Sequence, residues 1–130
     1  MEKTRFESGM EQLKAIDGIG GEHVIQSLET ISPDLGKYIV EFAFGDIYTR
    51  KGLTLQEREM ITISSLLTAG GCEAQLEVHI NGALNVGIEA DKIVETFVQC
   101  IPYTGFPKVL NAIYVAKKVF KERNIVPLCK

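Results

Sequence analysis

The stretch from Thr54 to Gly87 constrains the fold of this chain most, because two helix-like segments flank the pair Gly70-Gly71. Thr54 and Glu57 are three residues apart and precede an apolar run, which is the pattern of a capping box at a helix start. Gly70, Gly71 and Gly87 can adopt positive φ angles, so the pair is expected to end the first helix and Gly87 the second. The sequence therefore predicts two capped helices joined by a very short break.

Apolar residues at helical spacing predict further helices on both sides of this stretch, and no segment alternates as a strand would. Gly18, Gly20-Gly21 and Gly45 are expected to end helices, Ser32 to cap one before Pro33, and Pro102 to bend or end another. Gly105 should form a break, with Pro107 in the first turn of the last helix. The expected helices cover 2–16, 23–31, 33–44, 55–69, 72–86, 89–100 and 107–120, with a frayed tail from Glu122. We expect an all-α bundle of about six or seven short helices, in a single domain over 1–130.

Composition excludes several classes of protein. The hydrophobic content is 45%, which is high for a small monomer and suggests apolar surface buried between subunits. The net charge of −3 and the scattered cations form no nucleic-acid footprint. Met1 to Asp17 lacks an apolar signal region, and no run is long enough to span a membrane. The expected protein is cytoplasmic, and its three cysteines form no disulfide framework or zinc spacing.

Cys72 and His79 are the most reactive residue types on the predicted second helix. Cys72 directly follows the glycine pair, where unpaired amides and the helix dipole favour a thiolate; the alternative is a small apolar filler. His79 lies two turns further on, about 10 Å along the axis, so a direct bond between the two within one helix is not expected. The alternative for His79 is a half-buried imidazole that binds a backbone carbonyl.

Arg58 and Glu59 lie near the start of the predicted first helix. Glu59 shares a face with Ile63 and Leu66, which should draw its carboxylate toward the core, where it needs a partner. Arg58 points about 100° away, to a more polar side. The alternative is an ordinary solvated charge cluster at a helix start.

Six segments of the sequence, which include Arg58, Glu59 and His79, resemble the carboxymuconolactone decarboxylase family. This family also contains alkyl hydroperoxidase D-like proteins. The resemblance covers nearly the whole chain, so it does not depend on one short motif. It implies an all-helical alkyl hydroperoxidase D-like fold and a ring-like homo-oligomer, commonly a hexamer. The segments that carry it are 5–10, 20–24, 42–50, 52–59, 79–87 and 103–112.

The decarboxylase branch of this family removes CO2 from a carboxylated muconolactone in aromatic catabolism, without a cofactor. Such a reaction needs cations that hold carboxylates and an acid that protonates the enolate. The resemblance implies His79 as acid/base, with Glu59 able to orient site residues. It implies that Arg50 and Arg58 hold the carboxylates of the substrate and that Asp46 helps to orient the site residues. Asp46 and Tyr48, from the same connector as Arg50, are also expected to bind the substrate. The expected ligand is a small carboxylate, with no metal.

The hydroperoxidase branch of the family uses a Cys-x-x-Cys pair, and a thiol-dependent peroxidase or disulfide reductase is the second hypothesis. Cys72 matches the first cysteine of the pair, but Gln75 replaces the second. A sulfenic acid at Cys72 would need a resolving thiol from Cys100 or Cys129. The N-terminal half matches the decarboxylase branch better, although Phe44 and Tyr48 stand where that branch often has tryptophan. A third hypothesis is a non-catalytic oligomer that binds a small acid.

Overall fold

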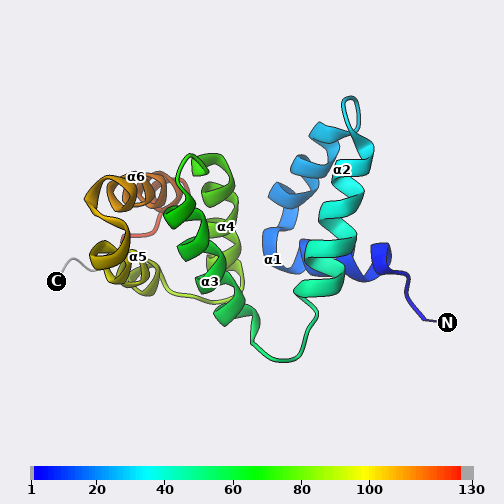
Figure 1. Ribbon diagram of the computed structural model, residues 1–130, viewed down its shortest axis with the longest axis horizontal. Helices are drawn as coiled ribbons and strands as arrows, with labels where there is room; N and C mark the ends of the chain where they lie inside the picture. The colour runs from blue at the N-terminus through cyan, green and yellow to red at the C-terminus, as the bar shows by residue number, and fades with distance from the viewer. Residues whose placement is uncertain (1, 127–130) are drawn as a thin grey trace. The chain divides into compact units, whose positions relative to one another are not determined.

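The computed structural model of the chain describes residues 2–126, and every regular element in that range is helical (Figure 1). The expected all-α class is therefore confirmed for the described chain. The chain forms two compact units, Met1–Leu55 and Gln56–Lys130, and each is built around its own helix contacts. None of the described helices combines the length and apolarity that a membrane span requires.

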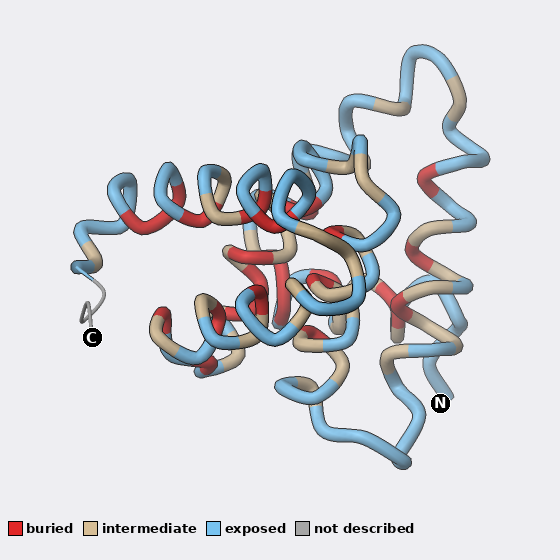
Figure 2. The backbone as a smooth tube through the Cα atoms, turned by 60° about the vertical axis from the view of Figure 1, so that its left-hand side comes forward, coloured by how far each residue is buried: buried red, intermediate tan, exposed pale blue. Residues whose placement is uncertain are grey.

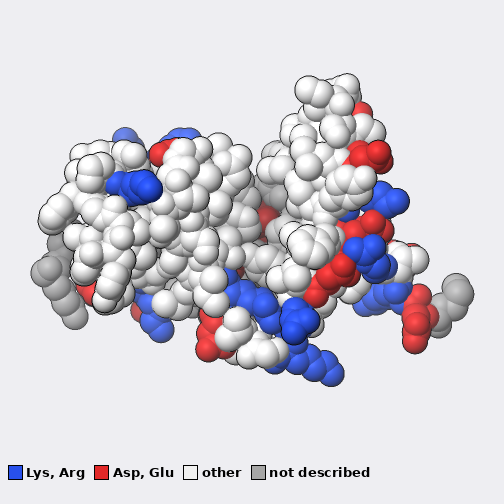
Figure 3. All heavy atoms as spheres, in the orientation of Figure 1, with Lys and Arg blue, Asp and Glu red and all other residues white. Residues whose placement is uncertain are grey.

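The N-terminal unit is a helical hairpin made of α1 (Arg5–Leu28), α2 (Pro33–Tyr38) and the π-helix η1 (Ile39–Ile47). Thr4 caps α1, because its Oγ1 accepts a hydrogen bond from the Glu7 amide at 3.1 Å. Pro33 lies in the first turn of α2 as expected, but the Ser32 side chain makes no capping bond. Basic and acidic side chains lie next to each other on part of this unit (Figure 3). Three ion pairs form there: Lys3–Glu11, Arg5–Asp46 and Lys14–Glu22.

Two glycines in this unit, Gly9 and Gly45, allow close packing of backbones, and the sequence suggested a helix end at one of them, Gly45. Gly45 lies inside η1, and a Cβ there would come within 2.8 Å of the Arg5 carbonyl oxygen on α1. The approach at Gly9 on α1 is closer still, since a Cβ there would lie 2.0 Å from the Val40 carbonyl oxygen. The expectation that Gly45 ends a helix is wrong, because the glycine is needed for the approach of α1 and η1.

The expected division of the first forty residues is also wrong in part. Gly18 leaves helical geometry, with φ 55° and ψ −136°, so it ends the first helical segment of α1 as expected, and a second segment continues to Leu28. Gly20 and Gly21 are helical. A Cβ on Gly21 would meet the Leu13 and Asp17 side chains at 2.8 Å. The second half of α1 therefore continues because Gly21 lets it pack closely against the first half.

The C-terminal unit consists of α3 (Leu55–Ala69), α4 (Glu73–Asn85), α5 (Ala90–Thr104) and α6 (Phe106–Glu122). Gly70, Gly71 and Gly87 have φ angles of 72°, 69° and 96°, which confirms the predicted breaks after α3 and α4. Gly105 ends α5 with φ 89°. Each helix turns one face inward, as the alternation of buried and exposed residues shows (Figure 2). The shared core is Ile63, Leu67, Leu76, Ile80, Ala83, Ile88, Ala90, Ile93, Phe97, Val109, Ala112, Ala116, Val119 and Phe120.

Two proline positions in this unit test the expected boundaries. Pro102 does not end α5, because it lies only two residues before the last helical residue, where the loss of one backbone hydrogen bond is tolerated. Pro107 lies in the first turn of α6, as expected. α6 ends at Glu122, where the sequence suggested fraying, and Cys129 lies outside the described residues.

Candidate functional site

Glu59 is the charged residue that the core of the C-terminal unit encloses completely. Its exposed fraction is 0%, and it shares the inward face of α3 with Ile63 and Leu67, each four residues apart. Helical periodicity explains this burial, because three residues at that spacing lie on one side of a helix. The sequence-based expectation that Glu59 turns toward the core is confirmed. Removing a carboxylate from water in this way is costly without a partner.

His79 on α4 provides that partner. Its Nδ1 lies 3.2 Å from Oε2 of Glu59, and its side chain keeps 18% of its surface exposed. With the proton on Nδ1, the ring donates a hydrogen bond to the carboxylate. Nε2 is then the ring nitrogen that can take up or release a second proton. A carboxylate that orients an imidazole through Nδ1 is the arrangement that prepares histidine for acid–base work. Thus α3 and α4 bring together two of the residues that the sequence singled out.

Arg58 precedes Glu59 on α3 and is half-buried, on a different side of the helix. It belongs to the same compact unit as the Glu59–His79 pair. A guanidinium is always charged and can bind a carboxylate through two parallel hydrogen bonds. Arg58 is therefore a cation of the right chemistry for an acidic ligand of this unit.

Cys72 is the N-cap residue of α4, as the sequence predicts, and it remains a free thiol. The thiol donates a hydrogen bond to the Gly70 carbonyl oxygen, with sulfur and oxygen 3.4 Å apart. The cavity that Cys72 lines with Lys108 and Asn111 has a volume of about 10 Å³, enough for one water.

The three connector residues of the predicted site lie in the N-terminal unit. Asp46 accepts two hydrogen bonds from Arg5, at 3.0 Å from Nε and 2.6 Å from Nη2. The bonded guanidinium lowers the pKa of the Asp46 carboxyl and, in return, the carboxylate raises the pKa of Arg5. Tyr48 stacks on Phe44, with ring centroids 4.9 Å apart and planes 13° from parallel, and Arg50 is exposed.

Sequence reasoning missed the Arg5–Asp46 pair, since 41 residues separate its members. Opposite charges this far apart in sequence give no local signal. The bidentate geometry fixes the Asp46 carboxylate at the end of η1. Its partner in this chain is thus a guanidinium from α1.

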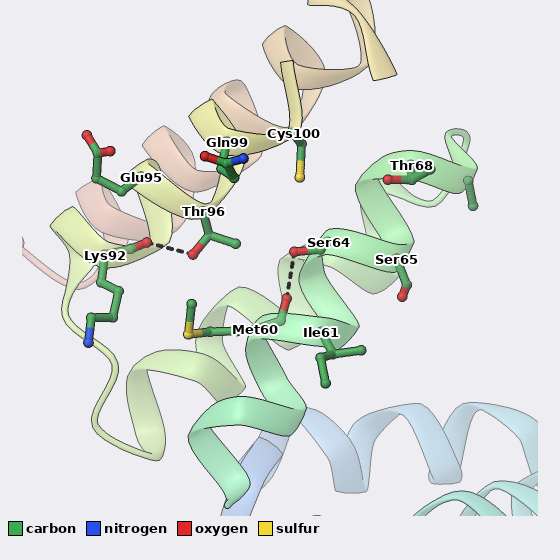
Figure 4. A pocket seen from close by; sticks show the side chains of 11 residues that line it. Met60, Ile61, Ser64, Ser65, Thr68, Lys92, Glu95, Thr96, Gln99 and Cys100 are labelled. Atoms are coloured by element: carbon green, nitrogen blue, oxygen red, sulfur yellow. Dashed lines mark hydrogen bonds between the residues drawn. The ribbon is translucent and has the colours of Figure 1, made fainter. Parts of the chain in front are cut away.

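An open groove of about 970 Å³ runs between α3 and α5, and it contains none of the predicted site residues (Figure 4). Two of its hydroxyl groups turn back to their own helices: Ser64 donates to the Met60 carbonyl oxygen and Thr96 to that of Lys92. The groove is lined by Met60, Ile61, Ser64, Ser65, Thr68, Ala69, Lys92, Glu95, Thr96, Gln99 and Cys100.

Comparison with known proteins identifies the family. Residues 33–118 match the sequence profile of the carboxymuconolactone decarboxylase family, which is well over half of the chain. The chain belongs to the carboxymuconolactone decarboxylase family. This membership agrees with the all-helical fold and with the resemblance seen in the sequence.

Three curated relatives of this family cover nearly all of the chain. A 4-carboxymuconolactone decarboxylase from Acinetobacter baylyi is 32% identical, over 97% of this chain and 94% of its own length. A nitrosuccinic acid decarboxylase from Metarhizium robertsii is 28% identical, over 94% of this chain and 85% of its own. An uncharacterized 15.0 kDa protein of Paracoccus denitrificans is 27% identical, over 92% and 90%. Two of these three relatives carry the name of a decarboxylase.

The described chain brings Glu59 and His79 together as a close pair of a carboxylate and an imidazole. In residues 2–126, no three or more His, Cys, Asp or Glu side chains gather in a way that could hold a metal ion. The expectation that the protein needs no metal and no cofactor stays a prediction. The roles of Arg50, Arg58, Asp46 and Tyr48 toward a substrate also stay predictions.

Proposed function

We propose that the protein is a cofactor-independent decarboxylase of a small carboxylated lactone or a related acid, with His79 as the acid/base. The observation that carries the proposal is the 3.2 Å contact between Nδ1 of His79 and the enclosed Glu59 carboxylate. The contact fixes the orientation of the ring, which a proton donor to a carbanion requires. The names of the two decarboxylase relatives support the reaction class.

The substrates named for these relatives share a chemical demand. Loss of CO2 from a carboxymuconolactone leaves a carbanion conjugated with a carbonyl group, and loss of CO2 from nitrosuccinic acid can leave one conjugated with a nitro group. In each case the C–C bond breaks, its electron pair enters the conjugated group, and a proton then adds to carbon. The protonated His79 would supply that proton through Nε2 and recover one from water. Net charge and atoms balance without an oxidant.

Cations would hold the carboxylates of the substrate. In this proposal Arg58 binds one of them, and Arg50 is the second holder, with Asp46 and Tyr48 shaping the connector around the ligand. In this proposal the active form is a homo-oligomer, a hexamer, in the cytoplasm. High hydrophobic content supports an oligomer, since apolar surface is then covered by other subunits.

The thiol-dependent peroxidase hypothesis has less support. The thiol of Cys72 donates a hydrogen bond to the Gly70 carbonyl oxygen. Three residues later α4 has Gln75, which has no thiol to resolve a sulfenic acid. The non-catalytic hypothesis predicts binding of a small acid without turnover. The same experiment separates all three hypotheses.

The test is an assay of CO2 release from 4-carboxymuconolactone and from nitrosuccinate, together with consumption of a hydroperoxide in the presence of a dithiol. Wild-type protein, His79→Ala and Cys72→Ala are compared. We expect His79→Ala to lower CO2 release by about 10²- to 10⁴-fold, and Cys72→Ala to change it by less than about twofold. Hydroperoxide consumption that disappears with Cys72 would instead support the peroxidase hypothesis. Binding of both acids without turnover would support the non-catalytic one.

A further inference from the structure

The first half of α3 has no fully buried apolar side chain. Of the three buried residues of this helix, Ile63 and Leu67 lie in its second half and belong to the shared core. The buried residue of the first half is Glu59, which carries a carboxylate. On the side toward α5, the helix borders the open groove instead of packed side chains (Figure 4). Core packing therefore holds the second half of α3 more firmly than the half that carries Glu59.

Gln56 makes a polar contact at the weakly packed start of α3. Its Nε2 donates a hydrogen bond to the Val86 carbonyl oxygen at the end of α4, with the two atoms 2.8 Å apart. Val86 is the C-cap of α4, and the last carbonyl oxygens of a helix have no partner within that helix. The amide of Gln56 thus completes the end of α4 and, at the same time, ties the start of α3 to it.

The Gln56–Val86 bond and the Glu59–His79 contact join the same two helices along the same faces. On α3, Gln56 precedes Glu59 by three residues, which makes them neighbours on one side of the helix. On α4, Val86 follows His79 by seven residues, or two turns, and returns to the same side. Because the start of α3 meets the end of α4, the helices run antiparallel. Two contacts along one seam fix both the sliding and the rotation of α3 against α4, whereas one contact fixes neither completely.

We propose that Gln56 is a positioning residue for His79. Its bond to the Val86 carbonyl oxygen holds the start of α3 at the place where the Glu59 carboxylate faces Nδ1 of the ring. This inference rests on the proposed role of His79 as the acid/base. Without the bond, the start of α3 is free to shift and to lengthen the 3.2 Å contact. The ring can then turn or carry its single proton on either nitrogen, so fewer molecules present Nε2 to a substrate in the working state.

Removal of the amide tests the proposal, with a second exposed glutamine as the matched control. Gln56→Met keeps the length of the side chain and suits a helix, but it has no N–H donor. A neutral hydrogen bond changes an equilibrium by a net factor of about 2 to 12. We expect kcat for CO2 release to fall by that factor, with KM within about twofold of wild type. Gln99→Met on α5 should leave both constants unchanged, and circular dichroism establishes that the variants are folded.

A double substitution separates positioning from a general structural role. Glu59→Leu fills the space of the carboxylate with an apolar side chain and leaves the ring without its acceptor. If Gln56 acts through Glu59, adding Gln56→Met to Glu59→Leu should lower kcat no further, because the effects of residues that act as one unit are not additive. A fall of equal size in both backgrounds, or in Gln99→Met, overturns the proposal.

The ring nitrogens of His79 give a readout that does not depend on turnover. Nitrogen NMR distinguishes the ring nitrogen that carries the proton, and the other histidine of the chain, His23, is exposed on α1 and serves as an internal control. We expect the neutral ring of His79 to carry its proton on Nδ1 in wild type and on a mixture of both nitrogens in Gln56→Met, with His23 unchanged. Unchanged His79 signals in Gln56→Met overturn the positioning role. If wild type releases no CO2, the proposed function fails, and these signals alone decide whether Gln56 positions the ring.

Discussion

Oε2 of Glu59 lies 3.2 Å from Nδ1 of His79, although the two residues come from different helices and only one of them reaches solvent. Glu59 is fully enclosed, whereas the imidazole is partly exposed. A ligand can therefore meet His79 but not the carboxylate behind it. In the proposed reaction this asymmetry gives the two residues different parts: the imidazole would exchange the proton, and the carboxylate would set its orientation.

Glu59→Gln should lower kcat for CO2 release with little change in KM. The amide keeps the size of the side chain but removes the negative charge that faces Nδ1 of His79. We expect a loss of about 10- to 100-fold, as is common when a group that orients a reactive residue is changed. It should not exceed the loss in His79→Ala, because Glu59 acts only through the ring. Steady-state kinetics of both variants measure this order.

Glu73→Gln is the matched control for Glu59→Gln. It removes an exposed carboxylate from the first turn of α4, the helix that carries His79. Its kcat should stay within about twofold of wild type, since surface charges away from the site have small effects. An equal loss of kcat in Glu73→Gln would contradict a specific role of Glu59. A rise in KM alone in Glu59→Gln would do so as well.

Arg58→Gln should raise KM more than it lowers kcat. A charge-assisted hydrogen bond from the guanidinium to a substrate carboxylate contributes about 1.5–3 kcal/mol, or roughly 10- to 150-fold in binding. Arg123→Gln serves as the control, because its guanidinium donates to Asn81 and Asn85 on α4, which already accounts for its position. An unchanged KM in Arg58→Gln would remove Arg58 from the substrate site.

The Arg5–Asp46 pair predicts a dependence of stability on pH. Arg5 lowers the pKa of Asp46 in the folded chain, so the folded state binds the proton more weakly than the unfolded state. The pair therefore stabilises the fold above the unfolded pKa of about 3.9, and this contribution is lost as pH falls through the lower folded value. Urea unfolding of wild type and Asp46→Asn should show a difference at pH 7 that shrinks between pH 4 and pH 3. A difference that is constant over this range would exclude the pair as its cause.

The raised pKa of Arg5 does not change this window. Its contribution is complete at any pH below its ordinary value and would be lost only in strong alkali. The pair is also exposed to solvent, with 59% and 37% of the two side chains accessible. Its effect should therefore weaken in high salt, and repeating the pH 7 measurement in 1 M salt checks this.

Local rules predicted what is decided within one helix. The burial of Glu59 followed from its spacing to Ile63, and the positive φ angles of Gly70 and Gly71 followed from their place between two apolar runs. The contact of Glu59 with His79 did not follow, because helical periodicity orients each helix only about its own axis. Which residue of α4 meets the inward face of α3 is decided by packing.

Glycine shows the same limit from the other side. A glycine that ends a helix and a glycine that lets two backbones approach look alike in a sequence. Gly45 is inside η1 because the Arg5 carbonyl oxygen lies only 2.8 Å from where its Cβ would be, and Arg5 is forty residues away. The single-domain organisation, the ring size and the substrate contacts of the connector also depend on such distant contacts, and they stay predictions.

Gly9 and Gly20, both on α1, provide a matched pair that tests the close packing of the N-terminal unit. A Cβ on Gly9 would lie 2.0 Å from a backbone oxygen of Val40, whereas a Cβ on Gly20 would meet nothing within 4 Å. Gly9→Ala must therefore push α1 and η1 apart, and we expect a loss of about 1–3 kcal/mol in the free energy of unfolding. Gly20→Ala should instead raise it by about 0.4–1 kcal/mol, because alanine restricts the unfolded chain and fits the helix. Urea unfolding of both variants measures the difference, and a Gly9→Ala variant as stable as wild type would show that α1 and η1 do not pack this closely.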